Sequence, residues 1–238
     1  CSDIAKTVWN KGKWPQTNFT AVALSRNGNI EISGFLGGDR LLFCTLGKLS
    51  SVAVGDEGTV SSKGNGCGGA YPVGQTPFPN GGGVCNESTT SGGGGGHGGN
   101  GGSSQDRQPG GKMYPPSKHG YSEESFIPTL DGENDLPFFS VQMTSEPLLA
   151  GAGGGCSGGG AGGGVIVVDT AIFDLRGKII ADGLPGTMST GVNEGAYGGG
   201  GAGGSVAVAA KVFTASSHGL ISVNGGTGVP SSSSTPIP

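Results

Sequence analysis

Charged residues are scarce in this chain: Asp, Glu, Lys and Arg make up 13% of its 238 residues, against about 25% in ordinary globular domains. The net charge is −4 and the isoelectric point is about 5.3, so the basic surface that nucleic acids require is missing. Hydrophobic residues reach only 33%, and no apolar run approaches the roughly 20 residues of a membrane span. We therefore expect neither a nucleic-acid partner nor a membrane span. Disordered chains combine low hydrophobicity with high net charge, and this chain has only the first of these two properties.

Residue patterns typical of catalysis or metal binding are lacking as well. The five cysteines form no CxxC pair and the three histidines are scattered, so no zinc site is indicated. The stretch 155–159 formally matches the GxSxG motif, but the strand–turn–helix context of a nucleophilic serine is absent around it. Asp131, Glu133 and Asp135 alternate as calcium ligands do, and calcium binding stays open beside a solvated acidic turn. The sequence predicts no enzyme and no cofactor.

Glycine is abundant instead, with 54 residues arranged in blocks rather than at every third position, which excludes collagen. The block 158–164 runs directly into the valine-rich segment at Val165, and the block 198–204 runs into the segment at Ser205. Glycine has no side chain to bury, so such blocks become ordered only through backbone hydrogen bonds. We expect adjacent blocks to pack as polyglycine II-like helices; flexible linkers are the alternative.

Four copies of a strand-forming unit follow one another along the chain, separated by loops of different length. Each copy contains short β-branched segments with period-2 alternation around a turn glycine, and none shows a helical stripe. One copy cannot bury its own apolar face, but stacked copies can. The sequence predicts an all-β fold of stacked short strands with little helix, as a β-helix-like solenoid or a small sandwich. The copies are 20–34, 41–66, 165–183 and 206–225, with turn glycines at Gly28, Gly58, Gly177 and Gly219.

Composition changes along the chain indicate five segments. The central one combines glycine-rich loops with an insertion of ordinary composition at 105–149, which is a candidate binding element because long loops often carry binding sites. The segments are an N-terminal arm (1–17), β repeats (18–66), glycine-rich loops with the inserted segment (67–150), further β repeats (151–228) and a Ser/Pro-rich tail (229–238).

Several features predict a secreted, extracellular protein. The chain starts with cysteine rather than methionine, as after removal of a secretory signal. Asn18 and Asn86 begin N-glycosylation sequons, and the tail has the composition of an O-glycosylated stalk. In an oxidising compartment most cysteines pair, so Cys44, Cys67, Cys85 and Cys156 are disulfide candidates, although Cys44 also suits a core position. The odd cysteine, Cys1, is a candidate for an intermolecular bridge.

The unit "poly-Gly, strand, turn Gly, Ile/Val-Ser, Asn-Gly-Gly", as in 198–226, resembles glycine-rich repeat regions of secreted surface proteins and of some phage tail adhesins. The resemblance covers roughly 20–70 and 150–228, and it implies polyglycine II helices packed as a layer. The five cysteines and two sequons depart from the phage proteins, and this departure favours the secreted class.

The sequence predicts a structural glycoprotein that assembles with itself into extracellular fibrils or a coat. Open sheet edges template the addition of another chain, and Cys1, Trp9 and Trp14 in the N-terminal arm are candidate contacts between subunits; folding of the arm onto its own core is the alternative for the tryptophans. A second hypothesis is an adhesin or receptor-binding domain that uses the inserted segment to bind glycans or a cell surface. Ice binding by flat polyglycine faces is a third, but no regular threonine array supports it.

Overall fold

A computed structural model describes the strands and most of the glycine-rich segments. The described residues are 20–26, 28–46, 48–69, 74, 81–85, 91–97, 100–104, 107–112, 150–188 and 197–229. Within these ranges the structure contains ten strands and no helix, which confirms the expected all-β class. Every pair of neighbouring named strands is parallel.

The strands form four successive levels, one for each predicted repeat, although the third strand of the first level (Phe35–Gly37) lies beyond the predicted copy 20–34. A level passes along a first, a second and a third face, and in the last two levels one long strand covers the first two faces. The levels are β1 (Thr20–Arg26), β2 (Asn29–Ile32) and β3 (Phe35–Gly37); β4 (Arg40–Leu46), β5 (Ser51–Val54) and β6 (Thr59–Ser61); β7 (Val165–Leu175) and β8 (Lys178–Ile180); β9 (Ser205–Ala215) and β10 (Leu220–Ser222).

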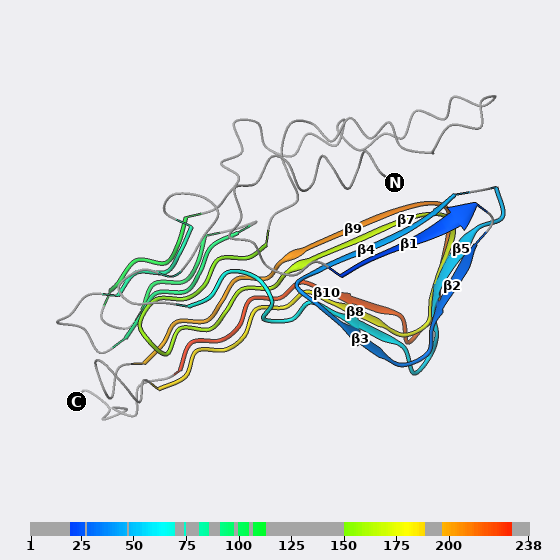
Figure 1. The fold of residues 1–238 in the computed structure, drawn as a ribbon. Helices are drawn as coiled ribbons and strands as arrows, with labels where there is room; N and C mark the ends of the chain where they lie inside the picture. Colours follow the sequence, from blue (N-terminus) through cyan, green and yellow to red (C-terminus); the bar gives the residue numbers. More distant parts are fainter. Residues whose placement is uncertain are drawn as a thin grey trace.

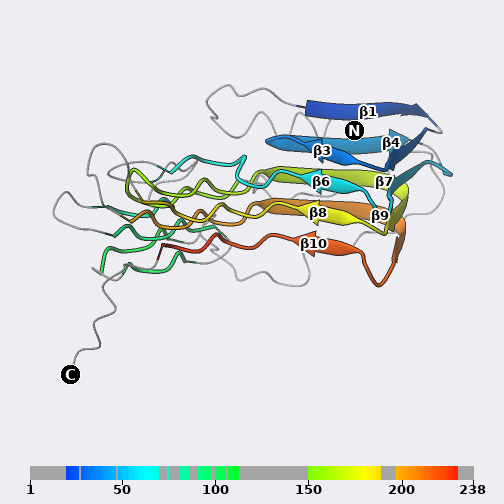
Figure 2. The same cartoon turned by 90° about the horizontal axis from the view of Figure 1, so that it is seen from below.

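These levels lie on top of one another around a three-sided interior, and together we call them the strand stack (Figure 1). The first face follows the order β1, β4, β7, β9 and the third the order β3, β6, β8, β10, as the side view shows (Figure 2). The second face joins β2, β5 and the later halves of β7 and β9. Parallel strands need long crossover connections, and here the winding of the chain supplies them.

The hydrophobic core is built from columns of side chains in register between levels. On the third face Leu36, Val60 and Ile179 occupy successive levels, and Val60 and Ile179 are buried. On the second face Val52 is in register with Phe173, whose ring is 0% exposed. The period-2 alternation predicts these inward positions because successive side chains of a strand point to opposite sides.

A glycine stands just before each strand of the third face. The hydrogen bonds between levels show that one of the four predicted turn glycines, Gly28, is not among them. The amide of Thr59 donates to the carbonyl of Gly34, as the amide of Lys178 does to that of Gly58 one level later. Gly34, rather than Gly28, is therefore the first-level counterpart of Gly58. A Cβ added to Gly58 would overlap the carbonyl oxygen of Ile32, so the close approach of levels at this corner requires glycine. Gly28 instead precedes β2.

Candidate assembly surface

The glycine-rich segments extend from the strand stack at the corner where the third-face strands end and the next first-face strands begin (Figure 1). They run beside one another without forming named strands, and backbone hydrogen bonds join neighbouring segments. We call this part the glycine layer; its members are 62–69, 74, 81–85, 91–97, 100–104, 107–111, 150–164, 181–188, 197–204 and 223–229. Its order therefore rests on the main chain.

Hydrogen bonds in the glycine layer recur at every third residue. The amide of Gly198 donates to the carbonyl of Thr187 at 2.9 Å. Three residues later Gly201 donates to Leu184 at 2.9 Å, and three residues after that Gly204 donates to Ala181 at 2.7 Å. The acceptors move backwards in steps of three, so the two segments are antiparallel. This period equals the three residues per turn of a polyproline II-type helix.

The same segment bonds to other neighbours with the same step. The amides of Gly199 and Ala202 donate to the carbonyls of Gly155 and Ala152, at 3.1 and 2.9 Å. On another side, the amide of Gly226 donates to the carbonyl of Gly201 at 2.7 Å. Successive residues of one segment thus reach different neighbours. A β-strand, whose period is two, would direct its bonds to only two neighbours.

Close backbone packing explains the composition of the glycine layer. A Cβ added to Gly154 would overlap the carbonyl of Gly199, and one added to Gly199 would overlap the carbonyl of Gly93. Gly102 differs, because an added Cβ there meets nothing within 4 Å. The layer therefore depends on glycine at its crowded positions and tolerates larger residues elsewhere.

Three side chains anchor the glycine layer. Cys85 and Cys156 form a disulfide with a Cα–Cα distance of 4.9 Å and a sequence separation of 71 residues. His97 lies between segments, where its Nδ1 hydrogen-bonds the carbonyl of Gly203 at 2.8 Å. Burial lowers the pKa of His97, and the backbone hydrogen bond partly offsets that effect. The neutral imidazole is therefore the form that this position favours.

Cys67, another predicted disulfide candidate, is a buried free thiol in the structure. Its main chain takes part in the glycine layer, donating to Gly151 and accepting from Gly162. Burial raises the pKa of the thiol to about 11, although the nearby Arg40 guanidinium opposes this effect. A thiol that remains protonated is a poor nucleophile, so we expect Cys67 to react slowly in the folded protein.

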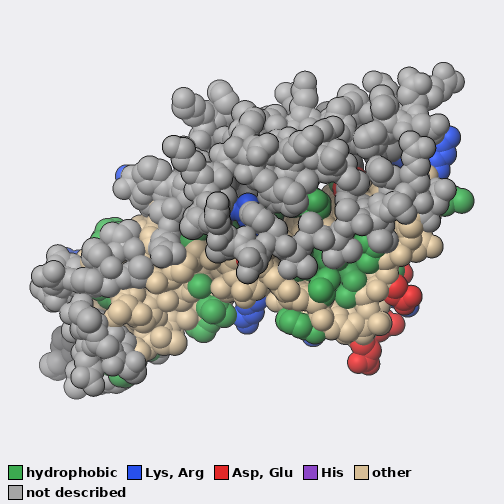
Figure 3. All heavy atoms as spheres, viewed as in Figure 1, with side chains coloured by type: hydrophobic (Ala, Val, Ile, Leu, Met, Phe, Trp, Pro, Cys, Tyr) green, Lys and Arg blue, Asp and Glu red, His purple; other side chains and the backbone are tan. Residues whose placement is uncertain are grey.

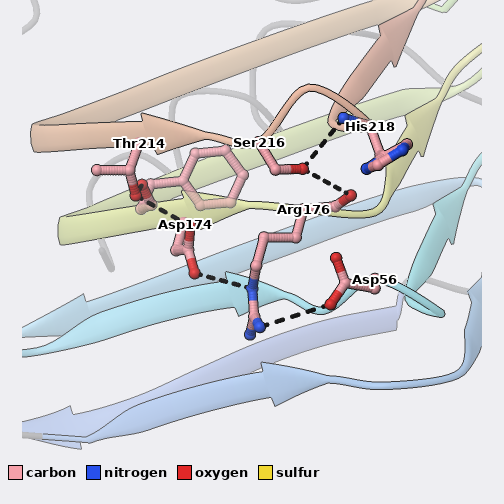
Figure 4. Close-up of polar contacts among 7 residues, drawn as sticks. Asp56, Asp174, Arg176, Thr214, Ser216 and His218 are labelled. Atoms are coloured by element: carbon pink, nitrogen blue, oxygen red, sulfur yellow. Dashed lines mark hydrogen bonds and ion pairs between the residues drawn. The ribbon is translucent and has the colours of Figure 1, made fainter.

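Polar contacts connect three levels at the end of the second face (Figure 4). The Arg176 guanidinium lies 3.1 Å from the Asp174 carboxylate and 3.7 Å from that of Asp56. Thr214, one level further, donates to Asp174 at 3.0 Å. These groups are substantially exposed, so solvent screens the ion pairs and their contribution to stability is small. These side chains form a row of polar contacts on the surface that links successive levels.

The strand stack is open at both ends, as judged from the described strands. At one end β9 pairs only with β7, and β10 only with β8. At the other end β1, β2 and β3 each pair only with the second level. Free strand edges carry unpaired backbone groups and are templates for further strands.

Hydrophobic side chains are exposed at both open ends. On the last level Phe213 is 53%, Leu220 46% and Ile221 41% exposed, while Phe35 on the first level is 76% exposed. Hydrophobic side chains also gather over the strand stack in the space-filling view, with acidic side chains at its far corner from the glycine layer (Figure 3). Terminal levels of a stacked fold need a polar outer face to stay soluble alone, whereas both of these levels expose large hydrophobic side chains among their described residues. The open ends are the candidate functional surface.

The remaining predicted site residues lie outside the described part of the chain. These are the sequon residues Asn18 and Asn86, the contact candidates Cys1, Trp9 and Trp14, and the calcium candidates Asp131, Glu133 and Asp135. The side chain of Cys44 is likewise outside the description. Among the described residues there is no cluster of His, Cys, Asp and Glu suited to a metal ion. That part of the chain also has no helix with the length and apolarity needed to cross a membrane.

The exposure of Phe213 and Ile221 was not predicted from the sequence, because strand alternation does not show which level ends the stack. Both residues belong to the last predicted repeat, 206–225, and this place in the chain order is the signal that could have distinguished them. No protein-family model matches the chain, and no curated protein or solved structure is significantly similar to it.

Proposed function

We propose that this chain is a structural protein that assembles with itself into fibrils or a coat. The observation that carries the proposal is the strand stack with two open ends, each with exposed hydrophobic residues. Burying such apolar surface against another subunit is favourable by about 25 cal/mol per Å², and a heterologous contact that does not close into a ring propagates into a filament.

In this proposal the four levels are the turns of a short β-solenoid, and the glycine layer is a packed set of polyglycine II helices. The parallel registers from level to level support the first assignment, and the three-residue hydrogen-bond step supports the second. Together they would give a stiff element with few charged groups, as a building block requires, and we propose no enzymatic role for it.

We further propose that the assembly is extracellular and glycosylated. The Cys85–Cys156 disulfide is compatible with an extracellular protein, since disulfides persist in oxidising compartments. Glycans would be attached at the sequons Asn18 and Asn86. Treatment of native material with an N-glycosidase tests this part: a loss of mass supports it, and an unchanged mass contradicts it.

A second candidate is an adhesin or receptor-binding domain, favoured by the long excursion of the chain between β6 and β7. Deleting 113–149 within that excursion separates the two functions. If the protein is an adhesin, attachment to cells or glycans disappears while any assembly persists.

The test of the main proposal is electron microscopy and sedimentation of the full, non-reduced chain over a range of concentrations. Fibrils or sheets above a critical concentration support it. A chain that remains monomeric at high concentration under oxidising conditions contradicts it.

A further inference from the structure

The two open ends of the strand stack have the same three-sided path and run in the same direction. At each register position of the second and third faces the chain has four residues, one per level, and the last of them faces the position where a fifth would lie. A translated copy of the chain places its first level, β1 to β3, in that position. Because the strands at both ends run parallel, only translation, and not a two-fold rotation, preserves their direction.

The side chains at the two ends match in this arrangement. The column of Leu36, Val60, Ile179 and Ile221 would continue with Leu36 of the next copy on Ile221. In the neighbouring column Phe35, 76% exposed, would cover Leu220, 46% exposed. Leu36 and Ile221 would thus become core residues. Phe35 and Leu220 would contact each other on the outer surface, because their column also holds the exposed Lys178.

The second face provides an independent match. The ring of Phe213 stacks on Phe173 with centroids 5.4 Å apart and an interplanar angle of 18°, yet Phe213 is still 53% exposed. In register, Ile30 of the next copy occupies the level beyond Phe213. Ile30 is only partly buried in its own chain, where it packs against the core cluster. In the proposed contact Ile30 and Phe213 would each bury the apolar surface that the other leaves exposed.

We propose, building on the self-assembly proposed above, that the partner at the β9–β10 end is the β1–β3 end of a second copy. The contact is head to tail and in register, so the strand stack continues from one chain into the next. The partner is thus another copy of this chain rather than a different protein, and the contact repeats to give a polar filament.

Cysteine pairing tests the register directly. Glu31 and Thr214 are exposed and occupy the same column, with Ala53 and Asp174 on the levels between. In the proposed contact Glu31 of one copy is next to Thr214 of the other, about 4.8 Å away across paired strands, within the range that a disulfide spans. A mixture of Glu31→Cys and Thr214→Cys chains should therefore form a covalent heterodimer under mild oxidation, and neither variant alone should form a new dimer beyond that of the wild type.

Different results would overturn the head-to-tail contact and the self-assembly itself. A dimer from either variant alone would indicate a symmetric contact and would overturn the head-to-tail arrangement. Fibrils without the heterodimer would leave the self-assembly intact and place the contact elsewhere. If the thiol introduced by Thr214→Cys is shielded from reagents in dilute, monomeric protein, the chain covers its own end, which also overturns the inference. No assembly at all would refute the proposed function itself.

A charged residue placed at the proposed contact between two copies gives a second test, measured as the critical concentration for assembly. Ile221→Asp places a carboxylate on the last level and should raise the critical concentration for assembly about tenfold or more. Ile172→Asp is the matched control: it makes the same change at a partly exposed position of the third level, whose strand is already paired on both sides. Equal effects of the two variants on assembly, with folding verified by circular dichroism, would contradict the contact.

Discussion

The strand stack and the glycine layer solve the same problem, the ordering of a long chain, by opposite means. In the strand stack, columns such as Leu36, Val60 and Ile179 bury side chains and exclude water. In the glycine layer there is almost nothing to bury, and order comes from backbone hydrogen bonds between segments. The first region therefore suffers when atoms are removed, and the second when atoms are added.

The largest expected effect is in the strand stack. Phe173→Ala removes a ring that is 0% exposed and should lower the free energy of unfolding by about 3–5 kcal/mol, as measured by denaturant titration followed by circular dichroism. Phe213→Ala, the same change one level further at a half-exposed site, is the control and should have a clearly smaller effect. Equal losses would contradict the assignment of the interior.

The disulfide should matter almost as much, but in the glycine layer. Replacing Cys85 and Cys156 together with serine releases a loop of 71 residues and should lower stability by about 2–4 kcal/mol. Hydrogen exchange should rise first in the glycine layer, while β7 and β9 remain protected. Cys67→Ala, which removes an unpaired thiol, serves as the control. Uniform loss of protection would show that the two regions unfold as one unit.

Adding a methyl group gives the sharpest contrast between the regions. Gly154→Ala places a Cβ on the carbonyl of Gly199 and should destabilise by about 1–3 kcal/mol. Gly102→Ala meets open space and should be neutral or stabilising by about 0.4–1 kcal/mol, because alanine restricts the unfolded chain. Thermal unfolding of the two variants measures the difference. Tolerance of alanine at both positions would contradict the close packing.

A smaller effect should follow pH. The pKa of His97 is lowered in the folded protein, so below the ordinary value near 6.5 the unfolded chain binds more protons than the folded one. The stability due to the neutral imidazole is thus complete above about pH 6.5 and decreases as the pH falls. His97→Gln, which cannot titrate, should remove this part of the pH dependence of the thermal midpoint. An unchanged profile in the variant would assign the dependence to other groups.

The smallest effect concerns chemical reactivity. Because burial raises the pKa of the Cys67 thiol to about 11, alkylation at pH 8 should be very slow in the folded protein and rapid in denaturant. Peptide mapping after timed labelling measures both rates. Fast labelling of the native chain would indicate that the glycine layer opens readily at this position.

Much of the strand stack is predictable, because alternation along a strand directly reports which side chains are buried. Each predicted repeat corresponds to one level, although the first copy (20–34) ends before β3, and inward positions such as Val60 and Ile179 follow the pattern. The equivalence of glycines is less predictable: the repeat pattern matches Gly28 to Gly58, but Gly34 occupies that place. Several glycines are available near each turn, so only the hydrogen bonds between levels distinguish them.

Pairing within the glycine layer cannot be read from the sequence. A run such as 198–204 offers the same backbone at every position, so composition does not specify which neighbour each amide meets. The disulfide shows the same limit: the sequence offers four candidates, and the fold brings together Cys85 and Cys156 while Cys67 remains free. Proximity between distant segments is decided by how the whole chain winds.

Three features of this protein are determined by its sequence alone: the all-β class, the four strand-forming units and the need for backbone hydrogen bonds in the glycine blocks. These follow from side-chain alternation, β-branching and the missing Cβ. The three-dimensional arrangement alone sets the parallel pairing of the strands, the three-residue recurrence of hydrogen bonds in the glycine layer, and the half-exposed ends of the columns at Phe213 and Ile221. The physical reason is that burial and pairing depend on what lies on the next level, and the last level has no described strand beyond it.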